Sequence, residues 1–163
     1  MGNQETGETV TLLARRRIEA AMLAEVHAVL VDRLGEEQAL SCLEETVTRA
    51  AFAAGQAFAA TAPDGPNLAH FRSVVALWQR GDALTIGNIR SEETRFSFDV
   101  TRCRYAESYR EMGLPEALAT RVSCLRDRAF VAGYSPHLLF ERPQTIASGA
   151  TCCPFTFTWD ADR

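Results

Sequence analysis

Four residues in the C-terminal half have side chains that could do chemistry together, namely Cys103, Cys124, Asp127 and Cys153. An ionised thiol is a strong nucleophile, and a carboxylate can act as a general acid or base. Three thiolates and a carboxylate would also suit zinc, so a metal-dependent enzyme is one alternative. However, the spacings of 21, 3 and 26 residues match no compact zinc motif, and no C-x-x-C pair occurs. We therefore expect a site with no metal and no cofactor.

Cys103 has the strongest argument for a reactive thiolate. It follows a predicted strand at 94–100 and stands near the start of a predicted helix at 101–112. With Thr101 as the N-cap, the thiol falls in the first turn, where free N–H groups and the helix dipole favour an anion. Arg102 and Arg104 flank it, and nearby cations also lower a thiol pKa. The alternative is a buried structural cysteine between two solvated arginines, and the spacing alone does not decide between them.

Asp127 is the candidate for proton transfer. It lies three residues after Cys124 in a predicted helix from about 115 to 132, on a different face from the main apolar stripe. A carboxylate on a partly apolar face must find a partner or take up a proton, and that is how a general acid or base arises. The alternative is a surface ion pair with Arg126 or Arg128.

Cys152 and Cys153 are adjacent in a predicted strand at 151–159, so their side chains point to opposite faces. Cys153 shares its face with Phe155 and Phe157, which should look inward, and it is therefore the member of the pair that could join a common site. Pro154 cannot donate to a ladder, which predicts an edge strand or a bulge at this point.

The elements that must position these residues follow from hydrophobic periodicity. The sequence predicts helices at 11–34, 36–60 and 67–79, strands at 83–90 and 94–100, helices at 101–112 and 115–132, and strands at 138–145 and 151–159. This order indicates one α+β domain over 1–163: an N-terminal helical hairpin and a third helix, then ββααββ with an antiparallel sheet covered by helices. We assign the site to the part at 81–163 and not to the helical part at 1–80. Gly133 is the expected end of the last helix, and the run Arg15, Arg16 and Arg17 is interpreted as a solvated face.

Composition narrows the class of partner. The chain has 163 residues, is 47% hydrophobic and 23% charged, and has a net charge of −4 with a pI near 5.4. An acidic balance argues against nucleic acid, and no segment is long and apolar enough to span a membrane. No signal-peptide pattern occurs at the N-terminus, which predicts a cytoplasmic protein with reduced cysteines. We expect a small-molecule substrate as the partner, and the paired N-terminal helices could form a homodimer interface.

The stretch from about 96 to 158 resembles the L-2-amino-thiazoline-4-carboxylic acid hydrolase-like family. The family's motifs are a Cys followed by Tyr-Ala-Glu, a Gly-Leu-Pro break, a Cys three residues before an Asp, and a strand ending in Gly and then Cys-Asp-Phe. In this chain they are Cys103 with Tyr105, Ala106 and Glu107; Gly113, Leu114 and Pro115; Cys124 with Asp127; and Thr145, Gly149, Cys153 and Phe155.

The resemblance implies a hydrolase that opens a small nitrogen heterocycle of the cyclic amidine, thiazoline, imide or lactam type. A thiolate from Cys103, Cys124 or Cys153 would attack the C=N or C=O carbon, and Asp127 would move the proton. It also implies substrate-binding roles for Arg102, Arg126, Tyr105 and Thr145, with either arginine suited to hold a carboxylate.

The chain departs from the family pattern near its last motif. The family usually has His before the final Cys and Asp after it, whereas this chain has Cys152 and Pro154, and it has Ser148 where an acidic residue is common. If the missing groups take part in catalysis, this member works differently or has lost activity. A non-enzymatic small-molecule binder or redox sensor on the same scaffold is therefore the second hypothesis.

Overall fold

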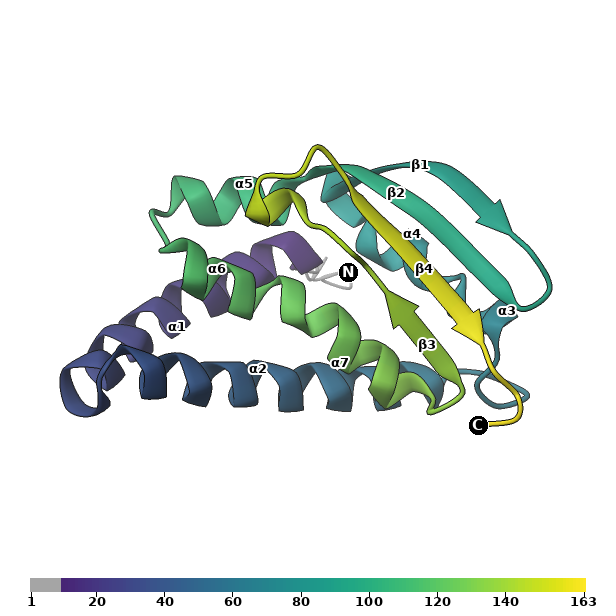
Figure 1. Cartoon of the computed structure of the whole chain (residues 1–163), viewed down its shortest axis with the longest axis horizontal. Helices are drawn as coiled ribbons and strands as arrows, with labels where there is room; N and C mark the ends of the chain where they lie inside the picture. Colours follow the sequence, from purple (N-terminus) through teal and green to yellow (C-terminus); the bar gives the residue numbers. More distant parts are fainter. Residues whose placement is uncertain (1–9) are drawn as a thin grey trace, which may run out of the picture.

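The computed structural model describes residues 10–163; residues 1–9, on which the signal-peptide argument partly rests, lie outside them. Its sheet has four antiparallel strands in the order β1-β2-β4-β3. The strands are β1 (Leu84–Ser91), β2 (Arg95–Cys103), β3 (Leu138–Glu141) and β4 (Cys153–Trp159). Helices pack on one face of this sheet (Figure 1), so the predicted α+β class and the ββααββ order of the second half are confirmed.

The two middle strands have the predicted inward faces. Phe98 pairs with Phe155 and Val100 with Cys153, and all four side chains are buried. The prediction that the strand with Pro154 is an edge strand is wrong, because this strand, β4, lies between β2 and β3. The strand tolerates the proline because the β3 ladder ends at the pair Glu141–Thr156, so β4 has a paired neighbour on one side only at Pro154.

The first two helices form the predicted hairpin, joined by Gly35 alone. The helices of the chain are α1 (Leu12–Leu34), α2 (Glu36–Ala59), α3 (Leu68–Phe71), α4 (Val74–Trp78), α5 (Arg104–Glu111), α6 (Glu116–Val122) and α7 (Cys124–Tyr134), with single 3₁₀ turns at η1 (Arg80–Asp82) and η2 (Ile146–Ser148). Gly35 has φ 82°, a conformation that costs glycine little.

Two helices that the sequence predicted as continuous are broken. The third helix is interrupted between α3 and α4, where the Ser73 hydroxyl donates to the His70 carbonyl at 2.7 Å and competes with the helical ladder. The predicted helix at 115–132 is interrupted at Ser123, since α6 buries Leu118 with the N-terminal helices and α7 buries Val131 against the sheet. One straight helix could not serve both clusters.

Helices α2 and α7 cross in backbone contact. An added Cβ at Gly55 would lie 2.1 Å from the Phe130 carbonyl oxygen, and one at Gly133 would lie 2.1 Å from the Phe52 carbonyl oxygen. Gly133 was predicted to end its helix, but the helix continues to Tyr134. The glycine is required by the close approach of α2, which Figure 1 shows running beside α7.

The apolar interior has two parts. One lies between the sheet and helices α3, α4 and α7, and the other lies among α1, α2, α5 and α6. Within residues 10–163, no helix is both long and apolar enough to cross a membrane.

Candidate active site

A pocket of about 1000 Å³ lies where the two apolar clusters meet. One wall is apolar and is formed by Ala51, Ala54, Phe58, Leu77, Trp78, Leu84, Phe130 and Phe155. The volume is at the upper end of the range of small-molecule sites. The pocket is lined not only by residues of 81–163, where the site was predicted, but also by α1, α2 and α4. The break between α6 and α7 and the end of β2 bring the polar residues to this place.

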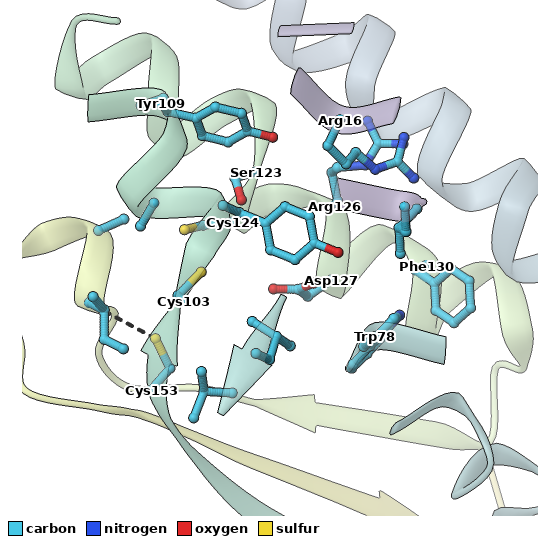
Figure 2. Close-up of a pocket in the computed structure, with 18 of the residues that line it drawn as sticks. Arg16, Trp78, Cys103, Tyr109, Ser123, Cys124, Arg126, Asp127, Phe130 and Cys153 are labelled. Carbon is cyan, nitrogen blue, oxygen red and sulfur yellow. Dashed lines mark hydrogen bonds between the residues drawn. The ribbon is translucent and has the colours of Figure 1, made fainter. Parts of the chain in front are cut away.

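All four sulfur and carboxylate residues predicted from the sequence enter the pocket, and they come from three different elements. Cys103 comes from the end of β2, Cys124 and Asp127 from the first turn of α7, and Cys153 from the start of β4. All four residues therefore converge on one pocket. Figure 2 shows the three sulfur atoms on one side of it, with the Asp127 carboxylate pointing into the space between them and the arginines.

The Cys103 thiol is not in the electrostatic setting that the sequence predicted. Strand β2 extends through Cys103, because Leu84 and Thr85 of β1 still pair with it and with Arg102, so Thr101 is no N-cap and Cys103 itself takes that position. Burial raises the pKa of the Cys103 thiol to about 11, although the N–H groups of Ala106 and Tyr105 oppose the shift. The thiol is therefore protonated at neutral pH.

The two arginines beside Cys103 do not face it. Arg102 has a side chain that is 61% exposed and binds both carboxylate oxygens of Glu107, at 2.8 and 3.0 Å. Arg104 donates to the Gly81 carbonyl at 3.0 Å. Neither residue lines the pocket. The proposed substrate-binding role of Arg102 thus has no support in its position, since a side chain that leaves the end of a strand can turn to solvent as easily as to the core.

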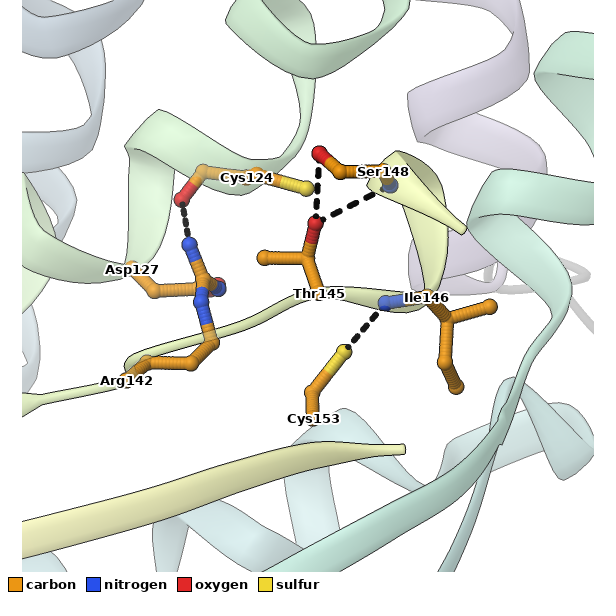
Figure 3. Close-up of polar contacts among 7 residues, drawn as sticks. All are labelled: Cys124, Asp127, Arg142, Thr145, Ile146, Ser148 and Cys153. Atoms are coloured by element: carbon orange, nitrogen blue, oxygen red, sulfur yellow. Dashed lines mark hydrogen bonds and ion pairs between the residues drawn. The ribbon is translucent and has the colours of Figure 1, made fainter. Parts of the chain in front are cut away.

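Asp127 is paired, but with a residue that the sequence analysis did not identify. The Arg142 guanidinium donates to Asp127 Oδ2 and, at 2.8 Å, to the Cys124 carbonyl (Figure 3). Arg142 follows β3 directly and also lies over the Phe140 and Phe155 rings, 5.6 and 5.3 Å from their centroids. The alternative of a surface pair with Arg126 or Arg128 is therefore wrong. Arg142 falls inside the predicted strand at 138–145, and nothing in the sequence singled it out.

Burial is the largest cause of the pKa shifts of Asp127 and Cys124. It raises the pKa of the Asp127 carboxyl, and the charge and hydrogen bond of Arg142 oppose that rise. It also raises the pKa of Cys124 to about 12, with the Asp127 carboxylate adding to the shift. The Asp127 side chain is 27% exposed, toward the pocket. The carboxylate can accept a proton from a pocket thiol or from a bound molecule.

Cys153 is held by the loop that precedes it. Its Sγ accepts the Ile146 N–H at 3.0 Å (Figure 3), and burial raises the pKa of this thiol as well. Thr145 does not reach the pocket. Its hydroxyl accepts the Ser148 N–H at 3.1 Å and donates to Ser148 Oγ at 3.0 Å, so it caps η2 instead of binding a substrate.

The end of the pocket away from the sulfur atoms is cationic. Arg16 and Arg126 both line it, each with a side chain only 15% exposed, and both ion-pair with Glu19. Arg126 was predicted, whereas Arg16 was wrongly assigned to a solvated face. Helical spacing could have found it, because Arg16 lies three residues after Leu13 and four before Ala20, on the buried face of α1.

Two tyrosines of α5 complete this end. Tyr105, a predicted substrate-binding residue, lines the pocket, and burial raises its pKa to about 12. Its hydroxyl is buried and has no hydrogen-bond partner within residues 10–163. The Tyr109 hydroxyl points toward Arg16 in Figure 2, and the charges of Arg16 and Arg126 act on its pKa. In the part of the chain that is described, no histidine lines the pocket and no three His, Cys, Asp or Glu residues are grouped to hold a metal ion.

Fold and site together define an α+β domain that encloses a small-molecule pocket between its sheet and its helices. The crystal structure of the phenol-responsive sensory domain of the transcription activator PoxR with phenol has a similar fold, with a TM-score of 0.52 at 13% identity over 91% of this chain and 76% of that chain. The family model for L-2-amino-thiazoline-4-carboxylic acid hydrolase matches residues 15–157, and the chain belongs to that family. A search of curated proteins found no match.

Proposed function

We propose that this chain is a hydrolase that opens a small cyclic amidine or a related nitrogen heterocycle by cysteine-assisted attack. The observation that carries the proposal is the convergence of Cys103, Cys124, Cys153 and Asp127 on one pocket in a member of a family named for such a reaction. Of the departures from the family pattern, Cys152 and Pro154 do not line the pocket, whereas Ser148, which stands where an acidic residue is common, does.

Cys103 is the proposed nucleophile. It is the pocket thiol on which two backbone N–H groups, those of Tyr105 and Ala106, act to favour the anion. With a pKa of about 11, only about one Cys103 in three thousand is ionised at pH 7.5. A bound amidinium would change this, because a cation beside a buried thiol favours the thiolate strongly. Activation by the substrate's own charge therefore replaces the histidine of more familiar cysteine enzymes.

The reaction proceeds in two halves. The Cys103 proton passes to Asp127 while sulfur bonds to the C=N carbon, and the C=N electron pair moves to nitrogen. Asp127 returns the proton to the ring heteroatom as the ring bond breaks, which leaves the former amidine carbon bound to sulfur. Water then attacks this carbon, and Asp127 accepts its proton. As the C–S bond breaks, the sulfur leaves with the bonding electron pair and takes that proton from Asp127, which regenerates the Cys103 thiol and the carboxylate and releases the product.

Mass spectrometry of reactions with L-2-amino-thiazoline-4-carboxylic acid tests the proposal. We expect product with the wild-type chain, loss of about a thousandfold or more in Cys103→Ser, and an unchanged rate in Cys42→Ser, since Cys42 is exposed on α2. A covalent adduct should appear on Cys103 by intact mass. Full turnover by the double variant Cys103→Ala/Cys153→Ala would refute the proposal.

A second candidate is a ligand-binding domain without turnover. Two observations favour it: the thiols are protonated at rest, and the fold is shared with a sensory domain whose structure contains phenol. It predicts that phenol raises the melting temperature of the chain by mass action and that no heterocycle of the amidine, imide or lactam type yields product.

A further inference from the structure

The cationic end of the pocket contains more positive than negative charge. Arg16 and Arg126 both approach the same oxygen, Glu19 Oε2, so that two guanidinium groups share one carboxylate. Arg15 also donates to Glu19, at 2.9 Å, but its side chain is largely exposed. The two buried arginines and Glu19 thus sum to a charge of about +1 at the pocket wall.

Arg126 is the less satisfied of the two arginines. Among residues 10–163 its one ion-pair partner is Glu19, at 3.7 Å, beyond ordinary hydrogen-bond length. Its pKa is lowered by burial and by the neighbouring Arg16 charge, and Glu19 and Asp127 oppose this only in part. A buried guanidinium with free N–H groups that faces a cavity favours an anion within that cavity.

The Tyr105 hydroxyl supplies an independent indication. It is buried and unpartnered in the described chain, which is costly for a polar group. The charges of Arg16 and Arg126 both act on it, so it lies near the same end of the pocket. A ligand oxygen that accepted from Tyr105 and from the two arginines would satisfy all three groups together.

We infer that Arg16, Arg126 and Tyr105 form a subsite for the carboxylate of a flat ligand, and that Glu19 is the resident counter-ion with which that carboxylate competes. The ligand body lies along Trp78 and Phe130, which belong to the apolar wall (Figure 2). The subsite deepens the proposed function by naming the feature that a substrate must carry. It concerns binding, so it can be tested apart from turnover.

Isothermal titration calorimetry of the full chain at pH 7.5 tests this with benzoate, benzamide and phenol as probes. We expect benzoate to bind at least about tenfold more tightly than benzamide or phenol. Arg16→Gln and Arg126→Gln should remove this preference and leave benzamide binding unchanged. Their neighbours Arg17 and Arg128 do not line the pocket, so Arg17→Gln and Arg128→Gln are the matched controls.

Glu19→Gln provides a test of opposite sign, because removal of the competing carboxylate should tighten benzoate binding several-fold. Equal affinity of the wild-type chain for benzoate and benzamide would overturn the inference, as would full preference in both arginine variants or weaker benzoate binding in Glu19→Gln. Failure of the proposed function would look different: the carboxylate preference would be intact, and L-2-amino-thiazoline-4-carboxylic acid would bind without being hydrolysed.

Discussion

Buried protonated thiols make the stability of this fold sensitive to alkaline pH. The pKa values of Cys103 and Cys124 rise from 9.0 to about 11 and about 12 on folding. At a pH between the unfolded and folded values, the unfolded chain has lost protons that the native chain retains. The native state then binds more protons, so the free energy of unfolding falls as pH rises above about 9.

The size of the effect follows from the same values. At pH 10, each thiol favours the unfolded state by about 1.4 kcal/mol, so Cys103 and Cys124 together remove about 3 kcal/mol of stability. That is a large fraction of the 5–15 kcal/mol typical of a domain. Tyr105 and Tyr109, whose pKa values burial also raises, add to the loss, but they do so equally in thiol variants.

Urea unfolding followed by circular dichroism under reducing conditions at pH 7.5 and pH 10 measures this loss. A serine hydroxyl does not ionise in this range, so Cys103→Ser/Cys124→Ser should lose about 3 kcal/mol less than the wild-type chain between the two pH values. Cys42→Ser, at an exposed position, should behave as wild type. An equal loss in the double variant and the wild type would refute the reasoning, since the buried thiols would then not be the groups that titrate.

Three further changes test the framework around the site. Gly133→Ala places a Cβ about 2 Å from a backbone oxygen of α2 and should destabilise the fold by about 3 kcal/mol or more, measured as a lower melting temperature. The control is Gly87→Ala, which has open space for the Cβ and should change the melting temperature little. Arg142→Met leaves the Asp127 carboxylate without its partner and should lower the free energy of unfolding, measured in urea, by about 3–5 kcal/mol. Adding Asp127→Asn should recover much of this loss. If the effects of the two substitutions are strictly additive, the pairing is contradicted. Met22 is 65% exposed in an apolar stripe of α1, and if the N-terminal helices form a homodimer, Met22→Glu should convert a sedimenting dimer to a monomer; a wild-type monomer at micromolar concentration would end that prediction.

Hydrophobic periodicity predicted the buried faces of strands correctly, because a single local pattern determines them. The alternation of Phe96, Phe98 and Val100 predicted the buried face of β2, and the alternation after Cys153 predicted that of β4. It also selected Cys153 over Cys152 as the pocket residue. These predictions hold because side-chain direction along a strand depends on the backbone alone.

Prediction failed where a side chain's environment is set by distant segments. The thiol of Cys103 was expected to be acidic from its immediate neighbours, yet Arg102 turns to Glu107 and the surrounding pocket wall removes water. Arg142 lies 15 residues from Asp127 and meets it only because β3 packs beside α7. No spacing rule on one helix or strand contains that information.

The charges in the pocket distinguish the hydrolase hypothesis from the hypothesis of a sensor without turnover. Arg142 neutralises Asp127, and Glu19 neutralises one of Arg16 and Arg126, so these five residues together have one positive charge in excess. A neutral phenol leaves every thiol protonated and the excess charge unmet. A zwitterionic amidine would place its carboxylate on the arginines and its cation beside the thiols and Asp127, and only that arrangement lowers the pKa of Cys103 at the moment of attack. Carboxylate preference and turnover should therefore appear together in an enzyme, whereas a sensor of neutral ligands needs neither.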